Sequence, residues 1–270
     1  MSENSKRLLV AFVGVPLILA SLYMGNIFFL MVLAVIALVS QSEFYALGNA
    51  KGLNPNKSVG RLFALVILLS YYFHFEADLI NVLILAAIVS MVVEIYAKNE
   101  SPILNTSVTL FSLIYPVSLI GTLYPLREID PTYHDVGFNI VLAVFIGVWF
   151  SDTSAYYLGR AFGKHKLYER ISPKKTWEGA IAGFSAAIIS MFTMRQIGFL
   201  DPSFTVVDVS FLAIFTGVGG QFGDLFESMI KRDAGVKDSG SFLPGHGGML
   251  DRFDGVLFAA PLTYIYFLLK

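Results

Sequence analysis

Nine long apolar segments, separated by short polar connectors, dominate the pattern of hydrophobic and polar positions along this chain. Each segment approaches the roughly 20 apolar residues that a helix needs to cross a bilayer. The predicted spans are Leu8–Met24, Ile27–Leu47, Val59–Phe75, Leu79–Tyr96, Ile103–Leu126, Val136–Leu158, Trp177–Ile197, Val206–Met229 and Leu250–Leu269. Only Gly25 and Asn26 separate the first two spans, and a re-entrant pair there would leave eight or ten. The pattern predicts an all-α polytopic membrane protein with about nine transmembrane helices.

The composition and the distribution of basic residues agree with this prediction. The 270-residue chain is 56% hydrophobic and 14% charged, whereas soluble domains carry about 25% charged residues. With a cytoplasmic N-terminus, all of the 19 Lys and Arg residues except Arg127, Arg195 and Lys270 fall on the cytoplasmic side. Because basic connectors stay in the cytoplasm, we expect a cytoplasmic N-terminus and a C-terminus outside. The chain has no cysteine, which excludes disulfides and thiolate catalysis.

The connectors are uneven, and the two long, charged ones lie late in the chain. They are Gly159–Thr176 and Ile230–Met249, and both are cytoplasmic in the predicted topology. We therefore expect an N-terminal transmembrane half, residues 1–135, that contains the first five spans. Residues 136–270 form the predicted catalytic half, with four spans and both charged loops.

One group of polar residues lies at the cytoplasmic end of the eighth span. Asp224, Glu227, Ser228 and Lys231 are offset by three, four and seven positions, which places them along one face of a helix. A charge near the end of a span is costly unless it is paired or bound to metal. A solvated helix end with a Glu227–Lys231 pair explains the same pattern equally well.

A second pair of carboxylates, Asp251 and Asp254, opens the ninth span. Three positions apart, they share a helix face, and the helix dipole alone favours acidic residues in a first turn. In the predicted topology, however, Asp224 ends one span and Asp251 begins the next, at a similar membrane depth. Two carboxylate pairs at one depth favour a site for hard cations such as Mg²⁺.

The connector between these carboxylates is basic and rich in glycine. Lys231, Arg232 and Lys237 provide donors for phosphates, and the segment 244–248 contains three glycines that let the backbone approach a ligand. A plain cytoplasmic loop would also be basic, and a lone His246 is more often structural than catalytic. The connector indicates an anionic ligand only together with the carboxylates.

The segment Ser172–Thr176 predicts a helix start that binds an anion. Ser172 reads as an N-cap before a proline at the first helical position, with Lys174, Lys175 and Thr176 in the first turn. Lysines there oppose the helix dipole, and a bound anion would explain them. The positive-inside rule is the competing explanation.

Three carboxylates and a glycine run lie inside other spans. Asp152, roughly two turns from the cytoplasmic end of the sixth span, is a functional candidate because of its depth. Glu43 and Glu94 are weaker candidates, and we expect them to make structural polar contacts. The glycines of segment 217–223 favour close helix packing.

Taken together, these motifs resemble a known family. They are Ser228-Met229-Ile230-Lys231-Arg232, Lys237-Asp238, Leu243-Pro244-Gly245-His246-Gly247-Gly248 and Asp251-Arg252-Phe253-Asp254, preceded by Ser151-Asp152-Thr153-Ser154-Ala155-Tyr156 and Ser172-Pro173-Lys174-Lys175-Thr176-Trp177-Glu178-Gly179. Their types and spacing are similar to the signature of phosphatidate cytidylyltransferases, also called CDP-diacylglycerol synthases. The resemblance covers the C-terminal half closely, while the N-terminal spans match only in being apolar.

The resemblance implies a reaction of CTP with phosphatidate that gives CDP-diacylglycerol and pyrophosphate. It also implies a requirement for Mg²⁺ with a possible second cation, a membrane homodimer and no nucleic-acid partner. We expect a multi-pass protein of the inner (cytoplasmic) membrane with its active site facing the cytoplasm. The implied catalytic residues are Asp224, Asp251, Lys231 and Arg232, the substrate-binding residues are Ser172, Lys174, Lys175, Thr176, Lys237, His246 and Arg252, and the metal ligands are Asp224, Asp251, Asp254 and Asp152.

Three other functions fit parts of the pattern. A secondary transporter would use Asp152, Asp224 and Asp251 as proton or sodium sites, but such groups usually lie near the bilayer midplane. A sister enzyme would transfer cytidylyl groups to another lipid phosphate, such as that of an isoprenoid ether lipid. A non-catalytic scaffold would leave the carboxylates without a purpose.

Overall fold

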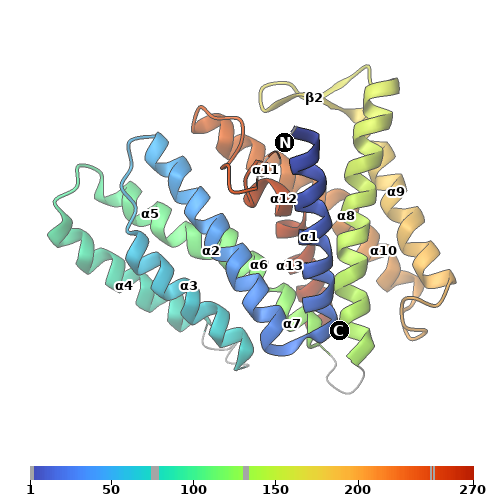
Figure 1. Cartoon of the computed structure of the whole chain (residues 1–270), viewed down its shortest axis with the longest axis horizontal. Helices are drawn as coiled ribbons and strands as arrows, with labels where there is room; N and C mark the ends of the chain where they lie inside the picture. Colours follow the sequence, from blue (N-terminus) through green and yellow to red (C-terminus); the bar gives the residue numbers. More distant parts are fainter. Residues whose placement is uncertain (1–2, 74–78, 130–133, 244, 246) are drawn as a thin grey trace. The chain divides into compact units, whose positions relative to one another are not determined.

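The computed structural model describes residues 3–73, 79–129, 134–243, 245 and 247–270. It divides into two compact units, which are considered separately: residues 1–125 with 230–252, and residues 126–229 with 253–270. The signature segment 230–252 groups with the N-terminal residues in the first unit, and the division into a transmembrane half and a catalytic half at residue 135 stays a prediction. In chain order the elements of the first part are α1 (Glu3–Met24), α2 (Asn26–Ala50), α3 (Lys57–Tyr72), α4 (Leu79–Ala97), α5 (Pro102–Ser112), η2 (Leu113–Ser118), α6 (Leu119–Gly121) and α7 (Leu123–Arg127) (Figure 1).

The second part of the chain continues mostly as helix. Its elements are α8 (His134–Phe162), β1 (Lys166–Tyr168), β2 (Ser172–Thr176), α9 (Trp177–Gln196), α10 (Val206–Ile214), η3 (Phe215–Gly219), α11 (Gly220–Asp233), α12 (Leu250–Phe253) and α13 (Val256–Leu268). Two of the long helical runs contain a single π-helical segment, η2 around Pro116 and η3 at Phe215–Gly219. Proline lacks the N–H that an α-helical bond needs, which accounts for the irregular turn at η2.

Six helical runs of the described chain are long and apolar enough to cross a membrane. They are Asn26–Ala50, Leu79–Ala97, Pro102–Arg127, Val136–Phe162, Trp177–Gln196 and Val206–Asp233, and Phe12–Met24 and Val256–Leu268 are shorter apolar helices. The chain is therefore a mostly helical polytopic membrane protein, as predicted. The count of nine spans and the orientation of the termini remain predictions.

The last predicted span, Leu250–Leu269, is wrong as a single helix. α12 ends at Phe253, and Asp254 and Gly255 form a turn before α13 begins at Val256. Asp251 and Asp254 therefore do not share a face of one continuous helix. The length of an apolar segment does not reveal such a break, because charged residues at the start of a span are tolerated both in a continuous helix and in a broken one.

In the first unit, α2 packs on α3 and η2, α3 packs on α4, and α4 packs on α5 (Figure 1). One buried polar side chain links three parts of this bundle. The side-chain amide of Gln41 donates to the Tyr45 hydroxyl, the Gly60 carbonyl and the Ser112 hydroxyl, each at 3.1 Å. Gly60 is required there, because a Cβ would lie 1.7 Å from the Tyr45 hydroxyl.

In the second unit, α8 and α9 form the most extensive helix pair (Figure 1). Small residues allow this approach: a Cβ on Gly179 would meet the Ala155 carbonyl at 2.7 Å and Gly159 Cα at 3.0 Å. A Cβ on Gly217 would lie 2.8 Å from Phe184, and one on Gly223 would lie 2.2 Å from the Asp254 carbonyl. The packing role that the sequence indicated for the glycines of segment 217–223 is confirmed at both positions.

The predicted helix start at Ser172 is wrong. Residues Ser172–Thr176 form strand β2, which pairs antiparallel with β1, and Lys166 lies opposite Thr176. α9 begins only at Trp177, where the Thr176 hydroxyl accepts the Gly179 N–H at 3.2 Å as an N-cap. Both Ser172 and Thr176 have the chemistry of a cap, and pairing with residues 166–168 decides between them. The chain is thus mostly helical rather than strictly all-α.

Candidate active site

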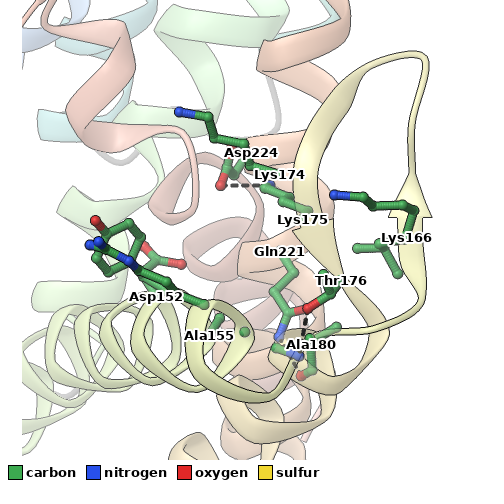
Figure 2. Close-up of a pocket in the computed structure, with 15 residues that line it drawn as sticks. Asp152, Ala155, Lys166, Lys174, Lys175, Thr176, Ala180, Gln221 and Asp224 are labelled. Carbon is green, nitrogen blue, oxygen red and sulfur yellow. Dashed lines mark hydrogen bonds and ion pairs between the residues drawn. The ribbon is translucent and has the colours of Figure 1, made fainter.

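A pocket of about 760 Å³ lies in the second unit, among α8, the β1–β2 hairpin, the start of α9 and α11. Figure 2 shows the residues that these four elements contribute to its lining. The lining residues are Asp152, Ala155, Tyr156, Gly159, Arg160, Gly163, Lys166, Leu167, Lys174, Lys175, Thr176, Gly179, Ala180, Gln221 and Asp224. The structure therefore brings together five of the predicted site residues: Asp152, Lys174, Lys175, Thr176 and Asp224.

An ion pair crosses this pocket. The Lys175 ammonium on β2 lies 2.6 Å from a carboxylate oxygen of Asp224 on α11 (Figure 2). The Ser228 hydroxyl donates to the other Asp224 oxygen at 3.3 Å, as their shared helix face predicted. Asp152 on α8 is close enough for its charge to interact with both Asp224 and Lys175. Two carboxylates and a lysine from three separate elements thus meet around one space.

Basic side chains surround the opening of α9. Lys174, Lys175 and Lys166 stand on the hairpin, and Arg160 belongs to the last turn of α8. The N-terminal amides of α9 add positive potential at the same place. Sequence reasoning missed Lys166 and Arg160 as site residues. Strand pairing folds the basic loop that carries Lys166 back over the helix start, and α8 continues to Phe162, so that Arg160 lies in its last turn beside the pocket.

The hairpin is fastened to α9 by Glu178, in the first turn of that helix. Its carboxylate accepts the backbone N–H groups of Lys164 and His165 at 3.1 and 3.2 Å, and it pairs with the His165 ring at 2.6 Å. Lys166 in turn donates to the Pro173 carbonyl at 2.6 Å. These contacts hold the basic strands over the pocket, while Ser172, at the far end of β2, does not line it.

Asp254 adds a further carboxylate to the second unit. It lies near enough to Asp224, Glu227 and Asp152 for their charges to interact, and Gly223 of α11 packs directly on its carbonyl oxygen. Carboxylate oxygens are the ligands that Mg²⁺ prefers, and Mg²⁺ is usually held by one or two of them together with water and substrate phosphates. Among the described residues, no three carboxylate or imidazole side chains form a ready metal cage. The donor chemistry fits Mg²⁺ bound jointly with a phosphate ligand.

In the first unit, Asp251 and Lys231 form a buried ion pair. The Lys231 ammonium lies 2.5 Å from one Asp251 oxygen, and the side chains are 10% and 6% exposed. The other oxygen accepts the Gly248 N–H at 2.7 Å and the Ser239 N–H at 3.0 Å. Burial raises the pKa of the Asp251 carboxyl, but the hydrogen bonds from Lys231 and Gly248 outweigh it and lower the pKa below its ordinary value.

Three of the remaining basic residues of the signature are exposed to solvent. Arg232 is exposed and donates to the Val236 carbonyl at 2.9 Å, and Lys237 and Arg252 are exposed. His246 lies outside the described residues. Asp224 and Asp251 belong to different units, so the predicted pairing of these two carboxylates stays a prediction.

The two weak candidates among the span carboxylates make structural contacts, as expected. Glu94 accepts from the side-chain amides of Asn99 and Asn105, both at 2.9 Å. Glu43 accepts the backbone N–H groups of Met249 and Leu250, both at 2.8 Å. Glu43 thus contacts the signature segment itself, a link that nothing in the local sequence around it indicated.

A polytopic helical membrane protein whose pocket is lined by basic side chains and carboxylates is suited to an anionic ligand such as a phosphate. Comparison with known proteins narrows this class. Residues 5–269 match the model of the cytidylyltransferase family, and the chain belongs to that family.

Several curated relatives are named phosphatidate cytidylyltransferase. The one from Staphylococcus epidermidis is 32% identical over 96% of this chain and 97% of its own length. That of Thermotoga maritima is 41% identical over 63% of this chain and 62% of its own length. The chloroplastic phosphatidate cytidylyltransferase 4 of Arabidopsis thaliana is 33% identical over 98% of this chain and 73% of its own length. The family predicted from the motifs is therefore confirmed.

Proposed function

We propose that this chain transfers the cytidylyl group of CTP to phosphatidate, forming CDP-diacylglycerol and pyrophosphate for phospholipid synthesis. Its family and the names of its relatives support the reaction type and the substrates. The single structural observation that carries the proposal is the pocket in which basic side chains and the Lys175–Asp224 pair surround the start of α9.

The pocket residues suit the triphosphate of CTP. Lys166, Lys174 and Arg160 line the pocket and supply positive charge for phosphate oxygens. The positive end of the α9 dipole adds to this positive potential and favours an anion. In the signature segment, Arg232, Lys237, His246 and Arg252 are further candidates for phosphate contacts, and Ser172 is a weaker one.

The chemistry requires charge neutralisation more than proton transfer. A phosphate oxygen of phosphatidate, already ionised at neutral pH, forms a bond to the α-phosphorus of CTP, and the bond to the β-phosphate oxygen breaks to release pyrophosphate. No strong general base is needed. A bound Mg²⁺, with a possible second cation, supplies charge neutralisation between the two phosphates. We propose Asp224 and Asp251 as principal cation ligands, with Asp254 and Asp152 as further ligands.

The two substrates determine where we expect the active site to lie relative to the membrane. Acyl chains stay in the bilayer while CTP arrives from the cytoplasm, so the proposed active site faces the cytoplasm at the inner membrane. A homodimer is part of the same proposal, and the mass of the purified protein in nanodiscs measures it directly.

The decisive experiment follows label from α-³²P-CTP into lipid, using purified protein in nanodiscs with phosphatidate and with or without Mg²⁺. We expect labelled CDP-diacylglycerol only when both phosphatidate and Mg²⁺ are present. A parallel reaction with an isoprenoid ether lipid phosphate tests the sister activity. Transfer to that lipid alone would overturn the substrate assignment, and absence of transfer to either lipid by folded protein would overturn the enzyme assignment.

A further inference from the structure

Glu43 occupies an unusual position for an acidic side chain. It is the only charged residue in the 25 residues of α2, a helix long and apolar enough to span a membrane. Its side chain is buried, at 7% exposure. Carboxylates inside membrane spans are costly and are retained where they have a defined partner or task. The partners of Glu43 therefore indicate what it does.

Those partners all lie in the signature segment, about 200 residues later in the chain and within the same compact unit. One carboxylate oxygen accepts the Met249 N–H at 2.8 Å. The other accepts the Leu250 N–H at 2.8 Å and the Ser239 hydroxyl at 3.0 Å. Glu43 thus ties together both ends of the stretch from Ser239 to Leu250.

The same stretch holds Asp251. Ser239 presents its N–H and its hydroxyl to one Asp251 oxygen, at 3.0 and 3.1 Å, and Gly248 adds its N–H at 2.7 Å. The Ser239 hydroxyl is therefore within hydrogen-bond distance of both carboxylates, Glu43 and Asp251. A displacement of the stretch at Glu43 necessarily moves the groups that fix Asp251.

Glycines make this close wrapping possible. A Cβ on Gly240 would lie 2.6 Å from a Glu43 oxygen, and one on Gly248 would lie 2.5 Å from the other. Gly247 has a φ of +83°, a left-handed conformation that glycine adopts without strain. A Cβ there would also lie 2.8 Å from Asp251. The glycines of the signature segment thus fit the backbone around two carboxylates.

We propose that Glu43 is a positioning residue for cytidylyl transfer, which acts by holding the segment 239–250 and, through it, Asp251. This inference rests on the proposed function for its catalytic part, but the holding of the segment is measurable without any reaction. Outer groups that orient a metal-binding side chain typically contribute 10- to 100-fold in activity or metal affinity when they are removed.

The variant Glu43→Gln preserves size but removes acceptor capacity. Its amide keeps one oxygen, while its NH₂ group faces donors where a carboxylate oxygen stood. The matched control is Glu94→Gln. Glu94 is the only charged residue of α4, is 8% exposed and lies in the same unit, and in the described part of the chain its hydrogen bonds come from Asn99 and Asn105. Ser239→Ala serves as a milder second variant in case Glu43→Gln does not fold.

The measurement is hydrogen–deuterium exchange of the intact protein in nanodiscs, together with the Mg²⁺ dependence of cytidylyl transfer. Glu43→Gln should speed exchange in residues 238–252 about tenfold, lower kcat roughly 10- to 100-fold and raise the Mg²⁺ concentration for half-maximal activity. Ser239→Ala should shift all three in the same direction, and Glu94→Gln should leave them near wild type.

Each result that differs from these expectations refutes a specific part of the proposal. Unchanged exchange in residues 238–252 of Glu43→Gln, or of Ser239→Ala if the first variant does not fold, refutes the holding role. Equal losses in the Glu43 and Glu94 variants refute a positioning role and leave a general structural one. Wild-type protein that shows no transfer refutes the proposed function, while the exchange data still decide whether Glu43 holds the segment.

Discussion

Replacing Asp224 by asparagine separates the chemistry assigned to the pocket from the stability of the fold. The substitution keeps the size of the side chain and removes the charge that pairs with Lys175 at 2.6 Å. These side chains are 31% and 26% exposed, and an ion pair so accessible to solvent contributes roughly 0–1 kcal/mol. We therefore expect the unfolding temperature of the variant to remain close to that of the wild type.

The expected effect on activity is far larger. A carboxylate that holds a metal ion against reacting phosphates contributes several kcal/mol to the stability of the transition state. About 3–4 kcal/mol corresponds to a roughly 100- to 1000-fold loss, because about 1.36 kcal/mol changes a rate tenfold. Asp224→Asn should thus lose at least 100-fold in kcat/KM for CTP while it stays folded and inserted in the membrane.

The same helix offers a matched control. Asp233, the last residue of α11, pairs with Lys51 at 2.5 Å, and both side chains are more exposed than the Asp224 pair. Asp233→Asn and Lys51→Ala each remove an equivalent ion pair outside the proposed site and should retain nearly full activity. The assay is labelled-CTP transfer at several CTP concentrations, paired with thermal unfolding. Activity above half of wild type in Asp224→Asn, or similar losses in Asp233→Asn, would refute the assignment.

Two further substitutions test the local structure around the pocket. Thr176→Ala removes the N-cap of α9 and should destabilise the fold by about 1 kcal/mol and raise KM for CTP. Thr176→Ser keeps the hydroxyl and should retain both the stability and the KM of the wild type. Equal effects of the two variants in thermal unfolding and kinetics would contradict the role of Thr176 as an N-cap. Gly223→Ala places a Cβ 2.2 Å from the Asp254 carbonyl and should destabilise the fold by roughly 1–3 kcal/mol. The matching Gly14→Ala, whose Cβ meets no described atom within 4 Å, should leave the unfolding temperature unchanged; equal behaviour of the two would argue against close packing at Gly223.

The sequence by itself determined the class of the protein. Apolar run length is a local property, and a bilayer requires about 20 such residues in a helix, so the long helices could be located without any contact information. The charged residues that remained were few enough for Asp152, Asp224 and the lysines of segment 172–176 to stand out. The motif spacing then identified the family, which the comparisons confirmed.

Only the tertiary structure decided the partners of these groups. Strand pairing with residues 166–168 turned the predicted helix start at Ser172 into β2 and brought Lys166 to the pocket. Glu43 gained its role from backbone amides that lie 206 and 207 positions away in the chain. A polar side chain satisfies its hydrogen bonds with whichever donors folding brings near it, and that choice depends on long-range packing. The length of the apolar segments therefore located the long helices, while the assembled fold alone showed which carboxylates hold the chain and which face the pocket.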